Sequence, residues 1–251
     1  MLRRLNLIIA LLFLITGTAG VAGNNTPIDN SNLTAEVKMQ EFEDRLHKLY
    51  DEIKLEDYNL SYDVFRHAMV GYFNLKNSHK LSDKKMISII DFSKSSREER
   101  FYTIDLANKK VIYYTLVAHG AKTGDDVARY FSNKVNSNQS SLGFYVTGET
   151  YTGSKGFSLR LDGMDYGYND KMRERAVVIH AADYVSEETA RQLGRLGRSW
   201  GCPALPRELN AEIINTIKEK TMIFAYYDDA KYLASSKYLN QQKAIDLALK
   251  G

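Results

Sequence analysis

Between residues 85 and 230 the chain consists mainly of short runs rich in Ile, Val, Tyr and Phe, and this pattern constrains the fold more than any other feature. Polar turns separate the runs and glycines punctuate the loops, as is typical of a β-rich domain. One pair of runs flanks Ala107-Asn108-Lys109, a sequence suited to a hairpin turn. The predicted strands occupy residues 86–92, 101–106, 111–118, 142–147, 157–161, 176–180 and 221–227.

Helical patterns surround this β-rich stretch. Phe42, Leu46, Leu49 and Ile53 recur at helical spacing, and a second amphipathic pattern begins at Ser61. Two short helices are predicted from about residues 186 and 206, and residues 231–251 predict a polar helical tail. The sequence therefore predicts a mainly β (α+β) fold, with an N-terminal helical region at 35–80, a β-rich domain at 81–230 and the tail at 231–251.

The first 22 residues have the three parts of a secretory signal peptide: basic Arg3 and Arg4, an apolar run at 7–15, and a small-residue segment that ends in Gly20-Val21-Ala22. The apolar run is well short of the about 20 residues that span a bilayer, which disfavours the alternative of a membrane anchor. Residues 23–34 predict a flexible leader. We expect export to the periplasm of a Gram-negative bacterium, with no membrane span after signal cleavage.

Charge and histidine spacing argue against several classes of function. The chain carries 34 basic and 31 acidic residues, so removal of Arg3 and Arg4 leaves 32 against 31, a net charge of +1. Such a balance is not typical of a nucleic-acid-binding protein. The five histidines lack zinc-site spacing, and one cysteine excludes an internal disulfide or a Cys-rich cluster. We expect no nucleic-acid partner, no metal and no cofactor.

Cys202 is the only cysteine, which is unusual for a chain predicted to enter an oxidising compartment. Such a thiol is a buried inert side chain, an intermolecular partner or a reactive nucleophile. Two features favour the nucleophile. The predicted strand at 176–180 ends in His180, and Cys202 follows in Ser-Trp-Gly-Cys-Pro, where Gly201 lets a substrate carbonyl approach the backbone and Pro203 fixes the next turn.

An imidazole beside a thiol is the usual activator of a cysteine nucleophile, so a Cys–His acyl-transfer dyad is predicted. A papain-like protease is a poor match, because its cysteine precedes its histidine within Cys-Gly-Ser-Cys-Trp. In this chain His180 precedes Cys202 and that motif is absent.

Six segments of the chain, in the same order, resemble the murein L,D-transpeptidase catalytic-domain family, the second branch of the YkuD-like superfamily. The segments are IIDFS at 89–93, LVAHG at 116–120, FSN at 131–133, SSLGFY at 140–145, RAVVIH at 175–180 and GRSWGCPAL at 197–205. The resemblance covers roughly residues 60–227. It implies a YkuD-like β-sandwich catalytic domain with N-terminal helices, two short inserted helices and a helical C-terminal tail.

The resemblance also implies a cysteine nucleophile that acts on peptidoglycan stem peptides. Cys202 would attack the carbonyl of the third stem residue, usually diaminopimelate, and expel the terminal D-alanine; an amine of another stem would then resolve the thioester. His180 would accept the thiol proton, and the backbone carbonyl of Ala181 would orient its ring. Backbone N–H groups around Gly201 and Cys202 are the candidate oxyanion donors, and Ser199 belongs to the same positioning turn.

The motif departs from that of the wider superfamily, which has Ser-His-Gly-Cys followed by an aliphatic residue and Arg or Asn. Here Trp200 replaces the histidine and Pro203-Ala204 replace the following pair, a form that the second branch shares. His180 is therefore the only base of the motif. Ser154-Lys155 is a second departure, which affects only loop contacts.

Four further residues are candidates for substrate binding. Arg198 and Arg195 would pair with the carboxylate of diaminopimelate, or remain solvated surface charges. His119 ends a predicted strand and would either line the cleft or serve a structural role. Trp200 would either wall the site or pack beside the turn.

Three functions are compatible with these residues. The leading one is an L,D-transpeptidase that cross-links stem peptides. The second is an L,D-carboxypeptidase or endopeptidase that hydrolyses the same bond with the same dyad, and the third is an inactive peptidoglycan-binding protein. Peptidoglycan stem peptides are the expected partner, and the sequence indicates no particular protein partner.

Overall fold

The computed structural model describes residues 34–249. The predicted signal peptide at 1–22 and all but the last residue of the predicted leader lie outside the described residues. None of the described helices combines the length and the apolar character that a membrane span requires.

The predicted N-terminal helices are confirmed. Helix α1 (Ala35–Ile53) and helix α2 (Tyr62–Asn77) each begin after a hydroxyl cap, because Thr34 accepts from the N–H of Val37 and Ser61 accepts from the N–H of Val64. A short 3₁₀ turn, η2 (Leu55–Tyr58), joins the two helices.

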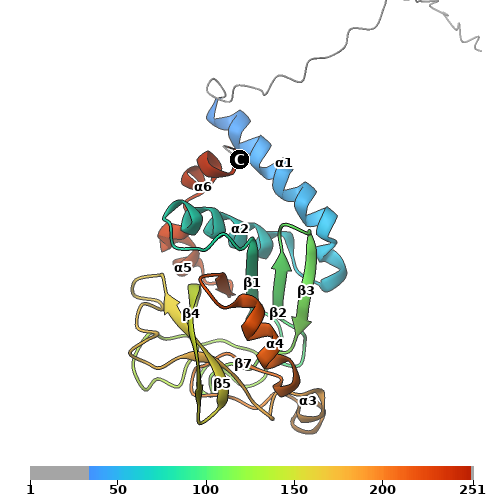
Figure 1. The fold of residues 1–251 in the computed structure, drawn as a ribbon, viewed down its shortest axis with the longest axis vertical. Helices are drawn as coiled ribbons and strands as arrows, with labels where there is room; N and C mark the ends of the chain where they lie inside the picture. Colours follow the sequence, from blue (N-terminus) through green and yellow to red (C-terminus); the bar gives the residue numbers. More distant parts are fainter. Residues whose placement is uncertain (1–33, 250–251) are drawn as a thin grey trace, which may run out of the picture. The chain divides into compact units, whose positions relative to one another are not determined.

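The strands form one eight-stranded sheet in the order β3-β2-β1-β8-β4-β5-β6-β7. Strands β1, β2 and β3 can be followed side by side in Figure 1. Their bounds are β1 (Met86–Asp91), β2 (Phe101–Asp105), β3 (Lys110–Thr115), β4 (Gly143–Gly153), β5 (Gly156–Gly163), β6 (Val178–Ala181), β7 (Ala204–Leu205) and β8 (Met222–Tyr226). Pairing is antiparallel except for β1 with β8 and β6 with β7. The α+β class expected from the sequence is confirmed, and the strands belong to a single curled sheet.

The centre of the sheet is covered on both faces. All five residues of β8 are buried, as are five of the six residues of β1, so neighbouring side chains on opposite faces are shielded from water. Helix α2 packs against β1 and β8, and helix α4 (Arg207–Ile217) packs against β1, β5 and β6. This arrangement explains why residues 86–92 and 221–227 read as nearly continuous apolar runs.

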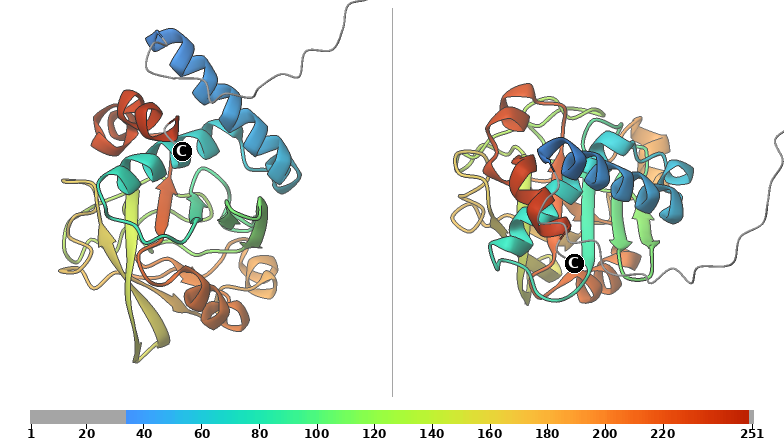
Figure 2. Two further views of the ribbon diagram at one scale, coloured as in Figure 1. Left: turned by 45° about the horizontal axis from the view of Figure 1, so that its top comes forward. Right: turned by 90° about the horizontal axis from the view of Figure 1, so that it is seen from above.

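The predicted helical C-terminal tail is confirmed, and it is divided into three short pieces. It contains helix α5 (Ala230–Ser235), the 3₁₀ turn η3 (Lys237–Leu239) and helix α6 (Gln241–Ala248). The tail is docked on the rest of the fold, because Tyr232, Tyr238 and Ile245 are buried and Asn74 of α2 donates to the carbonyl of Tyr238. Helices α1, α2 and α6 consequently lie together on one side of the sheet (Figures 1 and 2).

Strands β6 and β7 lie at one edge of the sheet, and the chain between them contains Cys202. Strand β6 begins at Val178, two residues later than predicted, because Ala176 has a positive φ of 52° that interrupts extended structure. Strand β7 is only two residues long and was not predicted. Helix α3 (Glu187–Leu193), capped by Ser186 as the sequence predicts, lies between β6 and β7 in the chain.

Candidate active site

Strand pairing brings three distant segments together around Cys202. His180 of β6 is in register with Ala204 of β7, and Ala204 also forms a β-bridge with Ala118. A second bridge joins Gly120 to Ser199. Residues 118–120, 199–204 and 178–181 therefore lie side by side, with the turn that holds Cys202 between the other two segments.

The thiol of Cys202 is half-buried against the start of β6. The backbone N–H of Val178 donates to Sγ over 3.5 Å, and Sγ lies 4.0 Å from the carbonyl oxygen of Ala176. Burial raises the pKa of the Cys202 thiol, and the Val178 N–H, Arg175 and Lys155 partly oppose this shift. Cys202 is therefore a neutral thiol near pH 7 in this arrangement.

His180 lies on the same strand as these contacts. Side chains two residues apart on a strand point to the same face, so the imidazole lies on the side of β6 that carries Val178. Nδ1 of His180 is 2.8 Å from the carbonyl oxygen of Ala181. A carbonyl oxygen only accepts, so Nδ1 carries the proton and Nε2 is left as the basic nitrogen. Burial lowers the pKa of His180, which keeps the ring neutral.

Ser199 holds the turn before the thiol. Its hydroxyl donates to the carbonyl of Cys202 over 2.6 Å and accepts from the N–H of Gly201 at 3.0 Å. Ser199 is anchored in turn by its own N–H, which donates to the carbonyl of His119. The side chain expected to position the turn therefore makes the two bonds that close it.

Gly201 is required by the backbone at this turn. Its φ is +125°, and a Cβ there would lie 2.8 Å from the carbonyl oxygen of Gln139. The N–H of Gly201 already donates to the hydroxyl of Ser199, so it is not available as the oxyanion donor expected from the sequence. The N–H of Cys202 has no hydrogen-bond partner among residues 34–249, and it is the open donor of the turn.

The two arginines considered for substrate binding already have an anionic partner. Arg198 Nη1 lies 2.8 Å from Asp125 Oδ1 and also donates to the carbonyls of Ala121 and Gly124. Arg195 Nε lies 3.4 Å from the same carboxylate oxygen. A substrate carboxylate at these side chains would compete with Asp125.

His119 is enclosed and does not line a cleft. Its Nδ1 accepts from Nη2 of the fully buried Arg100 at 2.8 Å, and its Nε2–H donates to the carbonyl of Asp125 at 3.1 Å. Burial and the charge of Arg100 lower the pKa of His119 to about 4. Of the two roles considered, these contacts favour the structural one.

Trp200 is 84% exposed, which argues against an aromatic ring packed into the fold beside the turn. It directly precedes Gly201 and Cys202, so its indole stands free next to the thiol turn. The indole is therefore accessible from solvent beside the turn that holds Cys202.

Three residues near the thiol were missed by sequence reasoning. Arg175 and Lys155 both act electrostatically on Cys202, and the pKa of Tyr184 is raised to about 12 by its burial and by the thiolate charge of Cys202. Arg175 is the first residue of the segment at 175–180 that resembles the family, and this position was the signal in the sequence that could have identified it. Tyr184 packs over Gly197, a contact between loops that no local pattern reveals.

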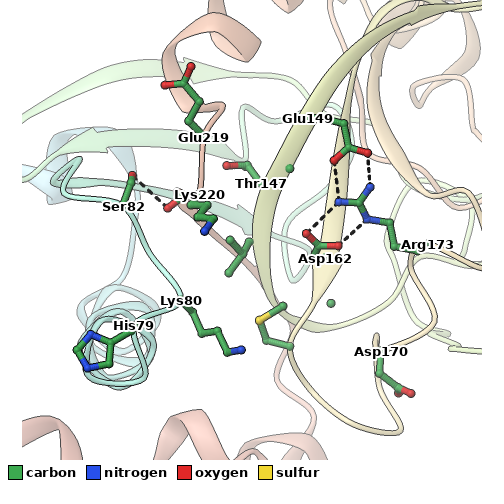
Figure 3. A pocket seen from close by; sticks show the side chains of 14 residues that line it. His79, Lys80, Ser82, Thr147, Glu149, Asp162, Asp170, Arg173, Glu219 and Lys220 are labelled. Carbon is green, nitrogen blue, oxygen red and sulfur yellow. Dashed lines mark hydrogen bonds and ion pairs between the residues drawn. The ribbon is translucent and has the colours of Figure 1, made fainter.

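A pocket of about 940 Å³ lies elsewhere, between the segment that follows α2, the middle of β4 and the end of β5 (Figure 3). Arg173 stands between the carboxylates of Glu149 and Asp162 on one side, and Lys80 and Lys220 line the other. The pocket includes neither Cys202 nor His180. No group of three or more potential metal-ligating side chains occurs among the described residues.

Residues 56–226 match the family described as L,D-transpeptidase catalytic domain. Among solved structures, the chain is similar to an L,D-transpeptidase from Mycobacterium smegmatis, with 11% identity over 57% of this chain and 59% of that one and a TM-score of 0.36. L,D-transpeptidase 3 from Mycobacterium tuberculosis has 11% identity over 57% of this chain and 61% of that one, with a TM-score of 0.35. The helical cell shape determining protein Pgp2 from Campylobacter jejuni has 14% identity over 64% of this chain and 57% of that one, with a TM-score of 0.38.

The matched region spans about three fifths of each of these structures. A comparison with curated proteins found no match.

Proposed function

The chain belongs to the L,D-transpeptidase catalytic-domain family, and from that membership we propose that it is an exported cysteine acyltransferase that cross-links peptidoglycan stem peptides. The observation that carries the proposal is the placement of Cys202. Its sulfur contacts the N–H of Val178 on the strand that carries His180, and the His180 ring is fixed by the carbonyl of Ala181 with Nε2 free.

Acylation begins from a neutral thiol and a neutral imidazole. The Cys202 proton passes to Nε2 of His180 as Sγ attacks the carbonyl carbon of the third stem residue. The oxygen of that carbonyl becomes an oxyanion, which the open N–H of Cys202 stabilises. The bond from that carbon to the nitrogen of D-alanine then breaks, the nitrogen takes the proton from His180, and a thioester remains on Cys202.

Deacylation reverses the roles. An amine of a second stem attacks the thioester carbon and passes its proton through His180 to the departing sulfur, which restores the thiol and leaves a new amide bond. Water in place of that amine would give a tripeptide and no cross-link, which is the hydrolytic alternative. The mechanism needs no redox step, and every proton is returned.

We also propose the surroundings of the substrate. Trp200 forms a wall beside the thiol turn, and Arg198 and Arg195 meet the carboxylate of diaminopimelate after exchanging Asp125 for it. Helix α2 packs against the sheet, helices α1 and α6 pack on α2, and all three lie apart from Cys202 in the sequence. Export to the periplasm, directed by residues 1–22, would bring the protein to this substrate.

The test is incubation of the purified protein with stem tetrapeptides, followed by mass spectrometry of the products. Cross-linked dimers together with free D-alanine are expected from the wild type and not from Cys202→Ala. Val37→Ala, at a half-exposed position on α1, is the control and should match the wild type. Tripeptide without dimers would indicate the hydrolytic function, and no product at all would contradict an enzyme acting on these peptides.

A further inference from the structure

Arg175 directs its guanidinium into the loop at 132–141. Nη1 donates to the carbonyl of Ser132 at 2.7 Å and to the hydroxyl of Ser141 at 2.5 Å. Nη2 donates to the hydroxyl of Ser137 at 3.2 Å and to the carbonyl of Gln139 at 2.5 Å. One side chain therefore ties together four points of a segment that contains no helix or strand.

The same guanidinium lies against the turn of the nucleophile. A Cβ on Gly201 would be 3.2 Å from Nη2 of Arg175 and 2.8 Å from the carbonyl oxygen of Gln139. The hydroxyl of Ser140 donates to the carbonyl of Gly201 at 3.2 Å. The backbone immediately before Cys202 thus rests on Arg175 and on the loop that Arg175 holds.

All four acceptors of Arg175 are uncharged, and no carboxylate among residues 34–249 forms an ion pair with it. Burial lowers the pKa of Arg175, although an arginine remains protonated at physiological pH. The ionisable groups that act on it are Tyr145 and Cys202. A half-buried cation without an anionic partner therefore stands near the group that must become a thiolate.

We propose that Arg175 is a positioning residue of this active site, which clamps the loop at 132–141 onto the Gly201–Cys202 turn and places a fixed positive charge against that turn. This proposal rests on the proposed function, because it takes the sulfur of Cys202 to be the nucleophile. Arg175 acts through the turn and through its charge, and it has no contact with substrate. Lys155 is the other cation that acts on Cys202, and it comes from the loop between β4 and β5.

The test measures the rate of Cys202 alkylation by iodoacetamide between pH 6 and 10.5, a readout that needs no turnover. In Arg175→Gln we expect the midpoint to rise by about one pH unit, because an opposite charge nearby is lost. Arg175→Lys keeps the charge but loses the planar fork, so its midpoint should stay near that of the wild type. Turnover of stem peptides should fall about tenfold or more in Arg175→Gln and less in Arg175→Lys.

Arg173→Gln is the matched control, because Arg173 is two residues away, exposed, and paired with Glu149 and Asp162. It should leave the midpoint of alkylation unchanged. A wild-type midpoint in Arg175→Gln, or an equal shift in Arg173→Gln, would overturn the proposal. If the wild-type protein does not turn over stem peptides, the proposed function is contradicted. The alkylation rates would still test the role of Arg175.

Folding of each variant is checked by circular dichroism and thermal melting. If Arg175→Gln does not fold, a double variant, Ser137→Ala with Ser141→Ala, removes two of the clamp contacts and keeps the charge. It should speed amide hydrogen exchange within residues 132–141 and lower turnover several-fold. Unchanged exchange in that loop would overturn the clamp.

Discussion

The backbone N–H of Val178 donates to Sγ of Cys202 over 3.5 Å, so the strand that carries His180 also contacts the sulfur. The parallel register of β6 with β7 produces this contact, because His180 is paired with Ala204, two residues after Cys202. A two-residue strand thus sets the position of the thiol relative to the imidazole.

The two groups should titrate as a neutral pair. The pKa of Cys202 is raised and that of His180 is lowered, both chiefly by burial, so near pH 7 the thiol keeps its proton and the imidazole has none. The acid limb of kcat/KM should therefore have a midpoint below about 6.5, and alkylation of Cys202 should have one above about 8.5. Stopped assays across pH 4.5 to 10.5 measure both. An alkylation midpoint well below neutral pH would show a preformed thiolate–imidazolium pair instead.

Ser199→Ala should loosen the turn before the thiol. The hydroxyl closes the turn through Gly201 and Cys202, and its loss leaves the buried Gly201 N–H without a partner, which costs about 1–3 kcal/mol. Turnover should fall about tenfold or more, because a small misplacement of a reacting group is costly. Chemical denaturation and steady-state kinetics measure the two effects. Ser199→Thr retains the hydroxyl and should recover most of both; equal losses in the two variants would contradict a role for the hydroxyl.

His119 should make folding sensitive to acid. Its pKa is about 4 in the folded protein, against about 6.5 when unfolded, so between these values the unfolded chain binds the extra proton. The contribution of His119 to the free energy of unfolding is fully present above pH 6.5 and is lost as the pH falls toward 4. This contribution is on the order of 3 kcal/mol. Urea unfolding at several pH values should show a shallower slope in His119→Gln than in the wild type.

The control for this slope is His79→Gln, which removes an exposed histidine outside the Arg100–His119 contact. Its pH dependence should follow that of the wild type. If His119→Gln loses stability with acid as steeply as the wild type does, the buried imidazole is not the source of the sensitivity.

Asp125→Asn should improve substrate binding. Asp125 holds Arg198 and Arg195, and an exposed ion pair of this kind is worth only about 0–1 kcal/mol, so the fold should tolerate the change. Removal of the competing carboxylate should lower KM for stem peptides a few-fold while kcat stays near its original value. Arg198→Gln should raise KM. No change of KM in either variant would show that the arginines serve only to anchor the loop.

Much of the fold follows from residue patterns. Runs such as 86–92 and 221–227 are apolar over most of their length because both faces of β1 and β8 are covered, and such runs are easily recognised as strands. Residues 231–249 predict a polar helical tail because Lys, Asp, Asn and Gln are interspersed with its apolar residues, although Tyr232 and Ile245 are fully buried. Burial of that kind depends on the partner helix, which sequence spacing does not reveal.

The site was only partly predictable. Cys202 and His180 stand in recognisable motifs, and the bond from His180 to Ala181 follows from adjacency in the chain. Strand β7 is too short to leave a pattern, and the positive φ of Ala176 contradicts its residue type. The contacts of Arg175 with the loop at 132–141 span more than 30 residues and arise only from the tertiary fold.

The most direct test of a cysteine acyltransferase is the intact mass of the protein after brief mixing with a stem tetrapeptide and an acid quench. The wild type should gain the mass of the tripeptide acyl group, and peptide mapping should place it on Cys202. Cys202→Ala should gain nothing, and His180→Ala should acylate far more slowly. An acyl group on any other residue, or equal product release by Cys202→Ala without a covalent species, would contradict the account.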